Sequence, residues 1–247
     1  MREFPLLKNA PIIEAVIDIK VKLPDSFKVN QLDSFSDFLK TNYPTKKEVK
    51  KFEGRIDLAQ EAALTPISGE TAGYRCDSED GKQVVQAMTE GFTFSRLKPY
   101  ISWEQFCEEA HKIWDHYKKI TSPELITRVA LRYINNLNIP VQEHEFKFHD
   151  FLTAPPAVPN DIPQAITEFV TRVVVPEPSI NANAIIIQAL EPISKPRLLP
   201  VILDIDVFSF NTDGIDEDPW DILESLRDFK NKIFFNSITN KLEEMYK

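Results

Sequence analysis

The chain has 247 residues, of which 43% are hydrophobic and 27% charged, a composition typical of a globular protein long enough to bury a core. Its formal net charge of −9 argues against nonspecific binding to nucleic acid or to an anionic membrane, because both require a surplus of lysine and arginine. No apolar run approaches the ~20 residues that cross a bilayer, and the N-terminus lacks the apolar core of a signal peptide. With only two cysteines, we expect a cytoplasmic protein without a disulfide framework and without a membrane segment.

The first half of the chain opens with an amphipathic strand. Between Ile13 and Leu23 apolar and charged residues alternate, which places an apolar row on one face of a strand and a charged row on the other. Apolar residues at helical spacing then predict a helix over Val29–Leu39. The elements expected next are a strand over Val49–Leu58, a hairpin made of strands Ala72–Asp77 and Gln83–Leu97, and a long helix that Ser102 caps.

The second half opens with the longest alternating strand, which we expect over Leu125–Ile139. Its apolar face carries Leu131 and Tyr133, and its polar face carries Arg128 and Arg132. A final helix begins with Asp218 as N-cap and Pro219 at its first position, and it is expected to run to the C-terminus. Between this strand and the final helix we expect a short helical segment, a proline-rich loop and three strands. They cover Phe146–Leu152, Ala154–Pro163, and then Ile166–Val175, Asn183–Leu190 and Leu198–Phe210.

Both halves therefore read strand, helical segment, three strands and long helix. We predict an α+β fold in which residues 1–121 and residues 122–247 form two similar halves of one compact unit. The halves are expected to share a continuous, mostly antiparallel sheet with the long helices on one face. The TATA-binding-protein-like fold has such a doubled layout, which is an analogy of architecture and implies no function.

Several phrases of the sequence resemble an uncharacterised prokaryotic protein family of about this length, whose members are sporadically distributed. The phrases span nearly the whole chain and lie at residues 9–15, 91–97 with Tyr100 and Trp103, 131–135, and 230–235. The resemblance implies a bacterial or archaeal cytosolic protein and brings no established activity. The patchy distribution allows a role in defence or in mobile elements.

A charged sheet face is the first candidate site. Glu14 and Asp18 lie on the polar face of the first strand, and Arg128, Arg132 and Asn136 lie on the polar face of its counterpart. If the two strands are neighbours, Asp18 can pair with Arg128 and Glu14 with Arg132. Such ion pairs fix the register between strands. Alternatively, the arginines bind a ligand or a peptide, since guanidinium groups hold carboxylates and phosphates in a fork.

Asp204 and Asp206 form a second candidate, because residues two apart on a strand share a face. Paired carboxylates can bind a divalent cation, and nucleotidyltransferases use such a strand, but the Gly-Ser turn that precedes it there is missing. A triphosphate-tunnel enzyme would also mix acidic and basic strand residues, but its Glu-x-Glu-x-Lys motif is absent. A solvated face, or partnership with the arginines, is the alternative interpretation of this pair.

Other site chemistry is sparse. The pairs His111 with His116 and His144 with His149 are five residues apart, which is not the spacing of zinc ligands on a helix. Cys107 is expected on the core side of its helix, and Cys76 has no adjacent histidine to activate it. No Gly-x-Gly loop occurs, and no cofactor is expected. The three tryptophans are expected in the core, and the aromatic pairs Phe92 with Phe94 and Phe208 with Phe210 are expected on the outer face of their strands.

The leading functional hypothesis is a non-enzymatic module that binds a ligand or a protein through the charged face of its sheet. The rival hypothesis is a metal-dependent enzyme that processes a phosphate or nucleotide at Asp204 and Asp206. A third is a subunit of a larger complex, or a self-associating protein, whose aromatic faces a partner buries.

Overall fold

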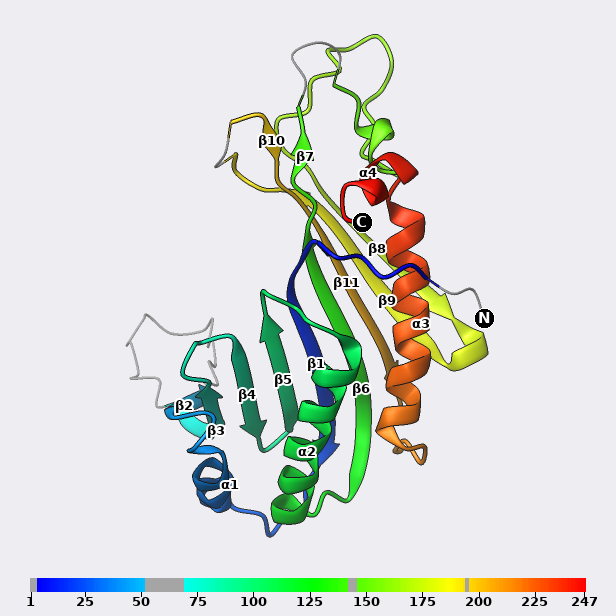
Figure 1. Cartoon of the computed structure of the whole chain (residues 1–247). Coiled ribbons are helices and arrows are strands. Elements are labelled where there is room, and N and C mark those ends of the chain that lie inside the picture. The colour runs from blue at the N-terminus through cyan, green and yellow to red at the C-terminus, as the bar shows by residue number, and fades with distance from the viewer. Residues whose placement is uncertain (1–3, 52–68, 142–145, 194–195) are drawn as a thin grey trace, which may run out of the picture.

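A computed structural model describes residues 4–51, 69–141, 146–193 and 196–247. It confirms an α+β chain built on a large antiparallel sheet (Figure 1). The described strands of this sheet run in the order β2-β3-β4-β5-β1-β6-β11-β9-β8. Their bounds are β1 Ile12–Lys22, β2 Thr45–Lys51, β3 Glu70–Asp77, β4 Gln83–Met88, β5 Gly91–Leu97, β6 Leu125–Asn136, β8 Val170–Glu177, β9 Ala182–Leu190 and β11 Val201–Phe210. The short strands β7 (Ile139–Pro140) and β10 (Leu198–Leu199) form a separate pair.

The two alternating strands of the sequence, β1 and β6, are neighbours at the centre of the sheet. They pair antiparallel, with Ile17 opposite Leu131 and Ile19 opposite Val129. These four side chains are fully buried on one face, as the period of two predicts. The arrangement brings the polar rows of both strands together on the other face.

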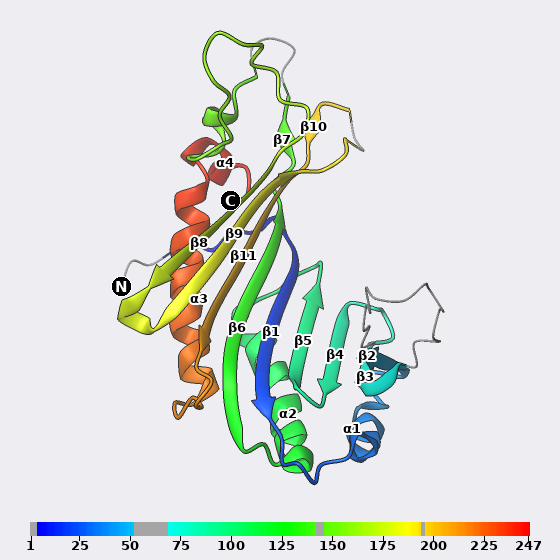
Figure 2. The ribbon, with the colours of Figure 1, turned by 180° about the vertical axis from the view of Figure 1, so that it is seen from behind.

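The long helices cover one face of the sheet, which we call the inner face (Figure 1). Seen from behind, the opposite or outer face has none of the described helices across it (Figure 2). Ser102 and Asp218 cap the two long helices as expected, since their side chains accept hydrogen bonds from Gln105 N and Trp220 N. The α-helices are α1 Leu32–Leu39, α2 Trp103–Thr121, α3 Pro219–Ser237 and α4 Asn240–Glu244, and 3-10 turns lie at Val29–Gln31, Phe148–Asp150 and Pro178–Ile180.

The core lies between the inner face and these helices. The Phe94 ring of β5 stacks on Phe106 of α2 with 5.4 Å between ring centroids. Trp114, also on α2, is 1% exposed, and Leu226 of α3 is equally buried. Aromatic rings of this size each remove a large apolar area from water, which stabilises the packing of α2 on β5.

Residues 83–97 form two strands, so the prediction of one strand there is wrong. β4 ends at Met88 and β5 begins at Gly91, which pairs with Met88 across the turn. A Cβ on Gly91 would lie 2.4 Å from Ile19 O, so only glycine allows β5 to begin this close to β1.

The same turn explains a second error, the expected outward direction of Phe92 and Phe94. They lie opposite Ile19 and Ile17 and are fully buried on the inner face. The chain reverses between Met88 and Gly91, so the odd residues face inward on β4 and the even residues do so on β5. Only the C-terminal pair, Phe208 and Phe210, keeps the expected outward direction.

Several predicted boundaries also shift. β6 ends at Asn136 because Asn138 adopts a positive φ of 41° and turns the chain into β7. Pro200 separates β10 from β11, as a residue without an N–H cannot continue the ladder. The last helix ends at Ser237, where extended Ile238 bridges to Leu152 before α4. The outer strands β2 and β8 begin at Thr45 and Val170, and the remainder of the strand expected over Val49–Leu58 falls outside the described residues.

Candidate binding face

A row of ion pairs crosses the centre of the outer face. We call it the ion-pair strip, and it is formed by the three adjacent strands β1, β6 and β11. Each arginine of β6 leans toward the C-terminal end of that strand and meets carboxylates from its neighbours. The strip consists of Asp18, Lys20, Arg128, Arg132, Asp204 and Asp206.

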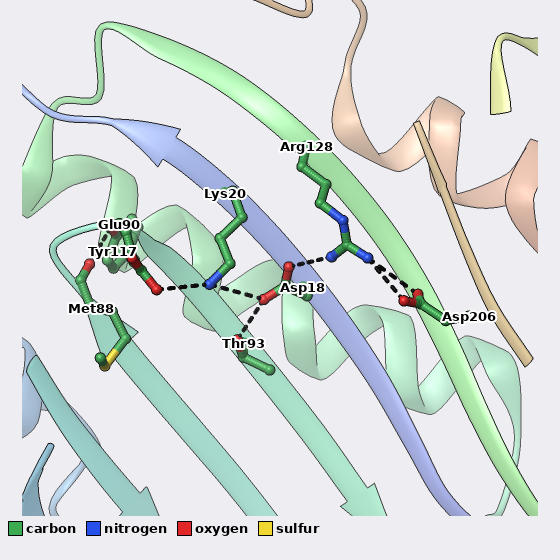
Figure 3. Close-up of polar contacts among 8 residues, drawn as sticks. All are labelled: Asp18, Lys20, Met88, Glu90, Thr93, Tyr117, Arg128 and Asp206. Carbon is green, nitrogen blue, oxygen red and sulfur yellow. Dashed lines mark hydrogen bonds and ion pairs between the residues drawn. The ribbon is translucent and has the colours of Figure 1, made fainter. Parts of the chain in front are cut away.

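Arg128 joins the two strands that flank β6 (Figure 3). Its Nη1 donates to Asp18 Oδ2 of β1 at 2.7 Å, and its Nη2 donates to Asp206 Oδ2 of β11 at 3.0 Å. The guanidinium also lies over the Phe208 ring, 4.7 Å from its centroid. Side-chain exposures of 23% for Arg128, 17% for Asp18 and 21% for Asp206 show that these charges are largely withdrawn from water. The predicted Asp18–Arg128 contact is therefore present, and Asp206 completes it.

Asp18 also connects the strip to β5 (Figure 3). Thr93 Oγ1 donates to Asp18 Oδ1 at 2.9 Å. Lys20 Nζ lies 3.6 Å from the same carboxylate oxygen and 3.3 Å from Glu90 Oε1. Thr93 and Glu90 were not singled out in the sequence. The register of β5 against β1 places Thr93 opposite Asp18, and that register is not visible in either strand alone.

Arg132 forms the second arginine contact of the strip. Its Nε and Nη2 donate to the two carboxylate oxygens of Asp204 at 2.8 and 2.5 Å, a bidentate pair. Glu14, the partner expected for Arg132, has no ion pair among the described contacts. Its charge contributes least to the raised pKa of Arg132, after the hydrogen bond and charge of Asp204 and the charge of Asp206. Asn136 lies apart from the strip, at the end of β6, where its Oδ1 accepts from Asn138 N.

The pKa values of Asp206 and Arg132 are both raised, for different reasons. Burial raises the pKa of the Asp206 carboxyl above its usual value, even though Arg128 and Arg132 pull that pKa down. The hydrogen bond to Asp204 raises the pKa of Arg132, whose side chain remains 45% exposed. Burial therefore disfavours the charged form of Asp206. Arg132 has the most exposed side chain among the residues that form the ion pairs of β6.

An apolar area lies beside the strip on the same face. We call it the apolar flank, and its aromatic member Phe210 is 54% exposed. Ile187 and Ile185 of β9 lie opposite Asp204 and Asp206, so they share the outer face with them. The apolar flank consists of Ile185, Ile187, Ile202, Phe208 and Phe210, all of them partly or fully exposed.

A second polar cluster lies on the inner face between α2 and α3. Lys230 of α3 is only 9% exposed, and its Nζ lies 3.9 Å from the centroid of the Tyr133 ring. The ammonium donates to Asn231 Oδ1, and burial lowers its pKa to about 7. Tyr133 and Tyr100 share a hydrogen bond of 2.8 Å between their hydroxyl groups. Sequence reasoning missed this cluster, because Lys230 reads as one more polar residue on an amphipathic helix.

The remaining candidate residues have structural surroundings. The His116 ring stacks on Phe38 with 3.7 Å between ring centroids, and the His111 ring stacks on Trp220 with 4.3 Å between centroids. His144 lies outside the described residues. Burial raises the pKa of the Cys76 thiol, and it raises that of Cys107 to about 11. Both thiols are therefore held away from the thiolate form that a nucleophile requires.

Among residues 4–51, 69–141, 146–193 and 196–247, no group of three or more His, Cys, Asp or Glu side chains could hold a metal ion. Within the same ranges, no helix has both the length and the apolar character to cross a membrane. No protein-family model matches the chain, and no curated protein matches its sequence.

Proposed function

We propose that the outer face of the sheet is a non-enzymatic binding surface for a protein partner. One observation carries the proposal: the apolar flank remains exposed beside a strip of paired charges, on a sheet face that no described helix covers (Figure 2). Apolar surface that is exposed in one patch and bordered by polar groups is typical of protein interaction sites.

The pairing of the charges favours a protein over a small acidic ligand. Arg128 already holds Asp18 and Asp206, and Arg132 holds Asp204 through two hydrogen bonds. A small anion would have to displace carboxylates that the strands keep in place. A protein surface can instead pack on the apolar flank and meet the exposed edge of Arg132, and it needs to break none of these pairs.

The same contacts weigh against the rival hypothesis of a metal-dependent phosphate or nucleotide enzyme. The carboxylates of Asp204 and Asp206 point to different guanidinium groups, so a divalent cation would have to replace both arginines before it could bind the pair.

The layout of the sheet supports our inference that the chain is a tandem of two related halves, residues 1–121 and 122–247. β1 lies beside β5 and β6 lies beside β11, so in each half the first long strand is next to the last one. A doubled layout like that of the TATA-binding-protein-like fold follows from this inference. Membership in the sporadic prokaryotic family, a cytoplasmic location and a role in defence or mobile elements remain proposals that rest on the sequence.

Photo-crosslinking in cells of the source organism tests the proposed surface. A photoreactive phenylalanine analogue replaces Phe210 on the outer face or, as a matched control, Phe38 on α1, which is 53% exposed against 54% for Phe210. We expect a discrete adduct with a second protein from position 210 and none of that mass from position 38. Absence of an adduct at 210, or equal adducts at both positions, would contradict the proposal.

A further inference from the structure

The two edges of the sheet differ sharply in character. β2 forms one edge, and its sequence Thr-Lys-Lys-Glu-Val-Lys-Lys provides lysines that discourage the addition of another strand. β8 forms the other edge, and its sequence Val-Thr-Arg-Val-Val-Val-Pro-Glu has no lysine. Figure 2 shows β8 as the outermost described strand beyond β9. Among the described strands, the edge at β2 therefore carries protective charges and the edge at β8 does not.

The valines of β8 are exposed on both faces of the sheet. On the outer face, Val170 is 69% and Val174 50% exposed, and on the inner face Val173 is 52% and Val175 37% exposed. Single exposed valines are common on protein surfaces, but four within six residues make this edge strand predominantly apolar, with Val173, Val174 and Val175 consecutive. The exposure of Val173 and Val175 shows that α3 leaves these two side chains uncovered on the inner face.

Alternate residues of β8 direct their backbone N–H and C=O groups away from β9. Leu190 N donates to Phe169 O at 3.0 Å, and the register continues with Thr171 opposite Gln188. In an antiparallel pair the residues that bond to the partner alternate, so odd residues of β8 turn their backbone groups to β9. Val170, Arg172 and Val174 then present theirs to the open side, and Pro176, which has no N–H, limits the ladder at its end.

We propose that two copies of this chain join through β8, antiparallel about a twofold axis at Val174, to form one continuous sheet. At this register Val174 faces Val174 of the second copy on the outer face. On the inner face Val173 faces Val175 of the second copy, so valine meets valine on both faces.

The position of Arg172 favours this register over one with the axis at Arg172 itself. An axis at Arg172 would set two guanidinium groups directly opposite each other, which is destabilising. With the axis at Val174, Arg172 lies opposite Pro176 of the second copy, and the two arginines are well separated along the strands. The N–H groups of Val174 and Arg172 find the carbonyls of Val174 and Pro176 in the second copy. The strand is thus complementary to itself, which is the requirement for a closed twofold interface.

Sedimentation velocity of the full chain tests the association. We expect a dimer that Val174→Lys weakens by at least about tenfold in Kd, because two ammonium groups would meet at the axis. Ile101→Lys is the matched control, since Ile101 is 56% exposed away from β8 and its replacement should leave the dimer intact. Unchanged thermal melting of both variants shows that the fold is retained. A wild-type protein that stays monomeric at about 100 μM, well above the Kd of specific dimers, overturns the proposal.

A disulfide tests the register. In this register Val173 and Val175 of the two copies form antiparallel pairs without hydrogen bonds, whose Cα atoms are about 4.5 Å apart, within the range that a disulfide spans. Mild oxidation should therefore crosslink two copies of a double variant, Val173→Cys with Val175→Cys, whereas Thr171→Cys, which falls opposite Glu177 of the second copy, should stay uncrosslinked. The wild type serves as a blank, because Cys76 is buried and Cys107 half-buried. A dimer in which the double variant Val173→Cys with Val175→Cys fails to crosslink, or a different protein found on β8, overturns the proposal and leaves the outer-face adduct at Phe210 untouched.

Discussion

Replacement of Arg128 by methionine should destabilise the protein far more than replacement of either carboxylate. The methionine keeps much of the side-chain volume but leaves Asp18 and Asp206 without the cation they share. Loss of one partner from a buried pair costs ~3–5 kcal/mol and loss from an exposed pair ~0–1 kcal/mol. Since the three side chains are 17–23% exposed, we expect a loss of about 2–3 kcal/mol in the free energy of unfolding at pH 7.

Asp206→Asn should cost no more than about 1 kcal/mol, because Arg128 keeps its contact with Asp18 and burial already opposes the charge of Asp206. Arg75→Met is the matched control on the same face. Arg75 is 44% exposed, and its partner Asp77 also contacts Lys47, so a loss of under about 1 kcal/mol is expected.

Urea denaturation followed by circular dichroism measures these differences, and the pH dependence checks their cause. Arg128 lowers the pKa of Asp206 against the effect of burial, so without Arg128 that pKa should rise further in the folded state. Folding then takes up protons, so the deficit of Arg128→Met relative to the wild type should shrink as the pH falls from 7 toward about 4.5. A loss below about 0.5 kcal/mol for Arg128→Met, or an equal loss for Asp206→Asn, would refute the reasoning.

Three further outcomes are expected. Burial holds the pKa of Lys230 at about 7, below its usual 10.5, so folding releases a proton and the free energy of unfolding should rise between pH 7.5 and 9.5. The slope should approach 1.4 kcal/mol per pH unit, vanish in Lys230→Met and persist in the exposed control Lys232→Met. Mn²⁺, Mg²⁺ and nucleotides should leave the melting temperature unchanged, and a shift that Asp204→Asn abolishes would instead favour the metal enzyme. A thiol reagent at pH 8 should label Cys76 and Cys107 much more slowly in the folded than in the urea-unfolded chain, and equal rates would contradict their burial.

The sequence predicted the local parts of this fold well. Alternation identified β1 and β6, and the capping residues Ser102 and Asp218 marked the starts of α2 and α3. The contact between Asp18 and Arg128 was also accessible, because it required only that two similar strands lie side by side. The strands and helix starts depend on periodicity or on residues close together in the chain, whereas the Asp18–Arg128 contact also depends on the two strands being neighbours.

The features that the sequence did not predict depend on the register between strands or on the packing of helices on the sheet. The turn between Met88 and Gly91 reversed the faces of Phe92 and Phe94, a change that the apolar pattern alone does not reveal. Asp204 became the partner of Arg132 because β11 rather than a second carboxylate of β1 supplies the closest oxygen atoms. Lys230 was missed because its burial arises where α3 packs on β6, an element distant in sequence.

Titration calorimetry with the protein that crosslinks at position 210 tests the central claim most directly. The wild type, Phe210→Ser on the outer face and Phe38→Ser on α1 are compared, with aromatic side chains of almost equal exposure removed in the two variants. We expect Phe210→Ser to weaken binding by at least about tenfold, as loss of an interface aromatic does, and Phe38→Ser to bind like the wild type. Equal affinities for all three proteins, or a loss confined to Phe38→Ser, would contradict the outer face as the binding surface.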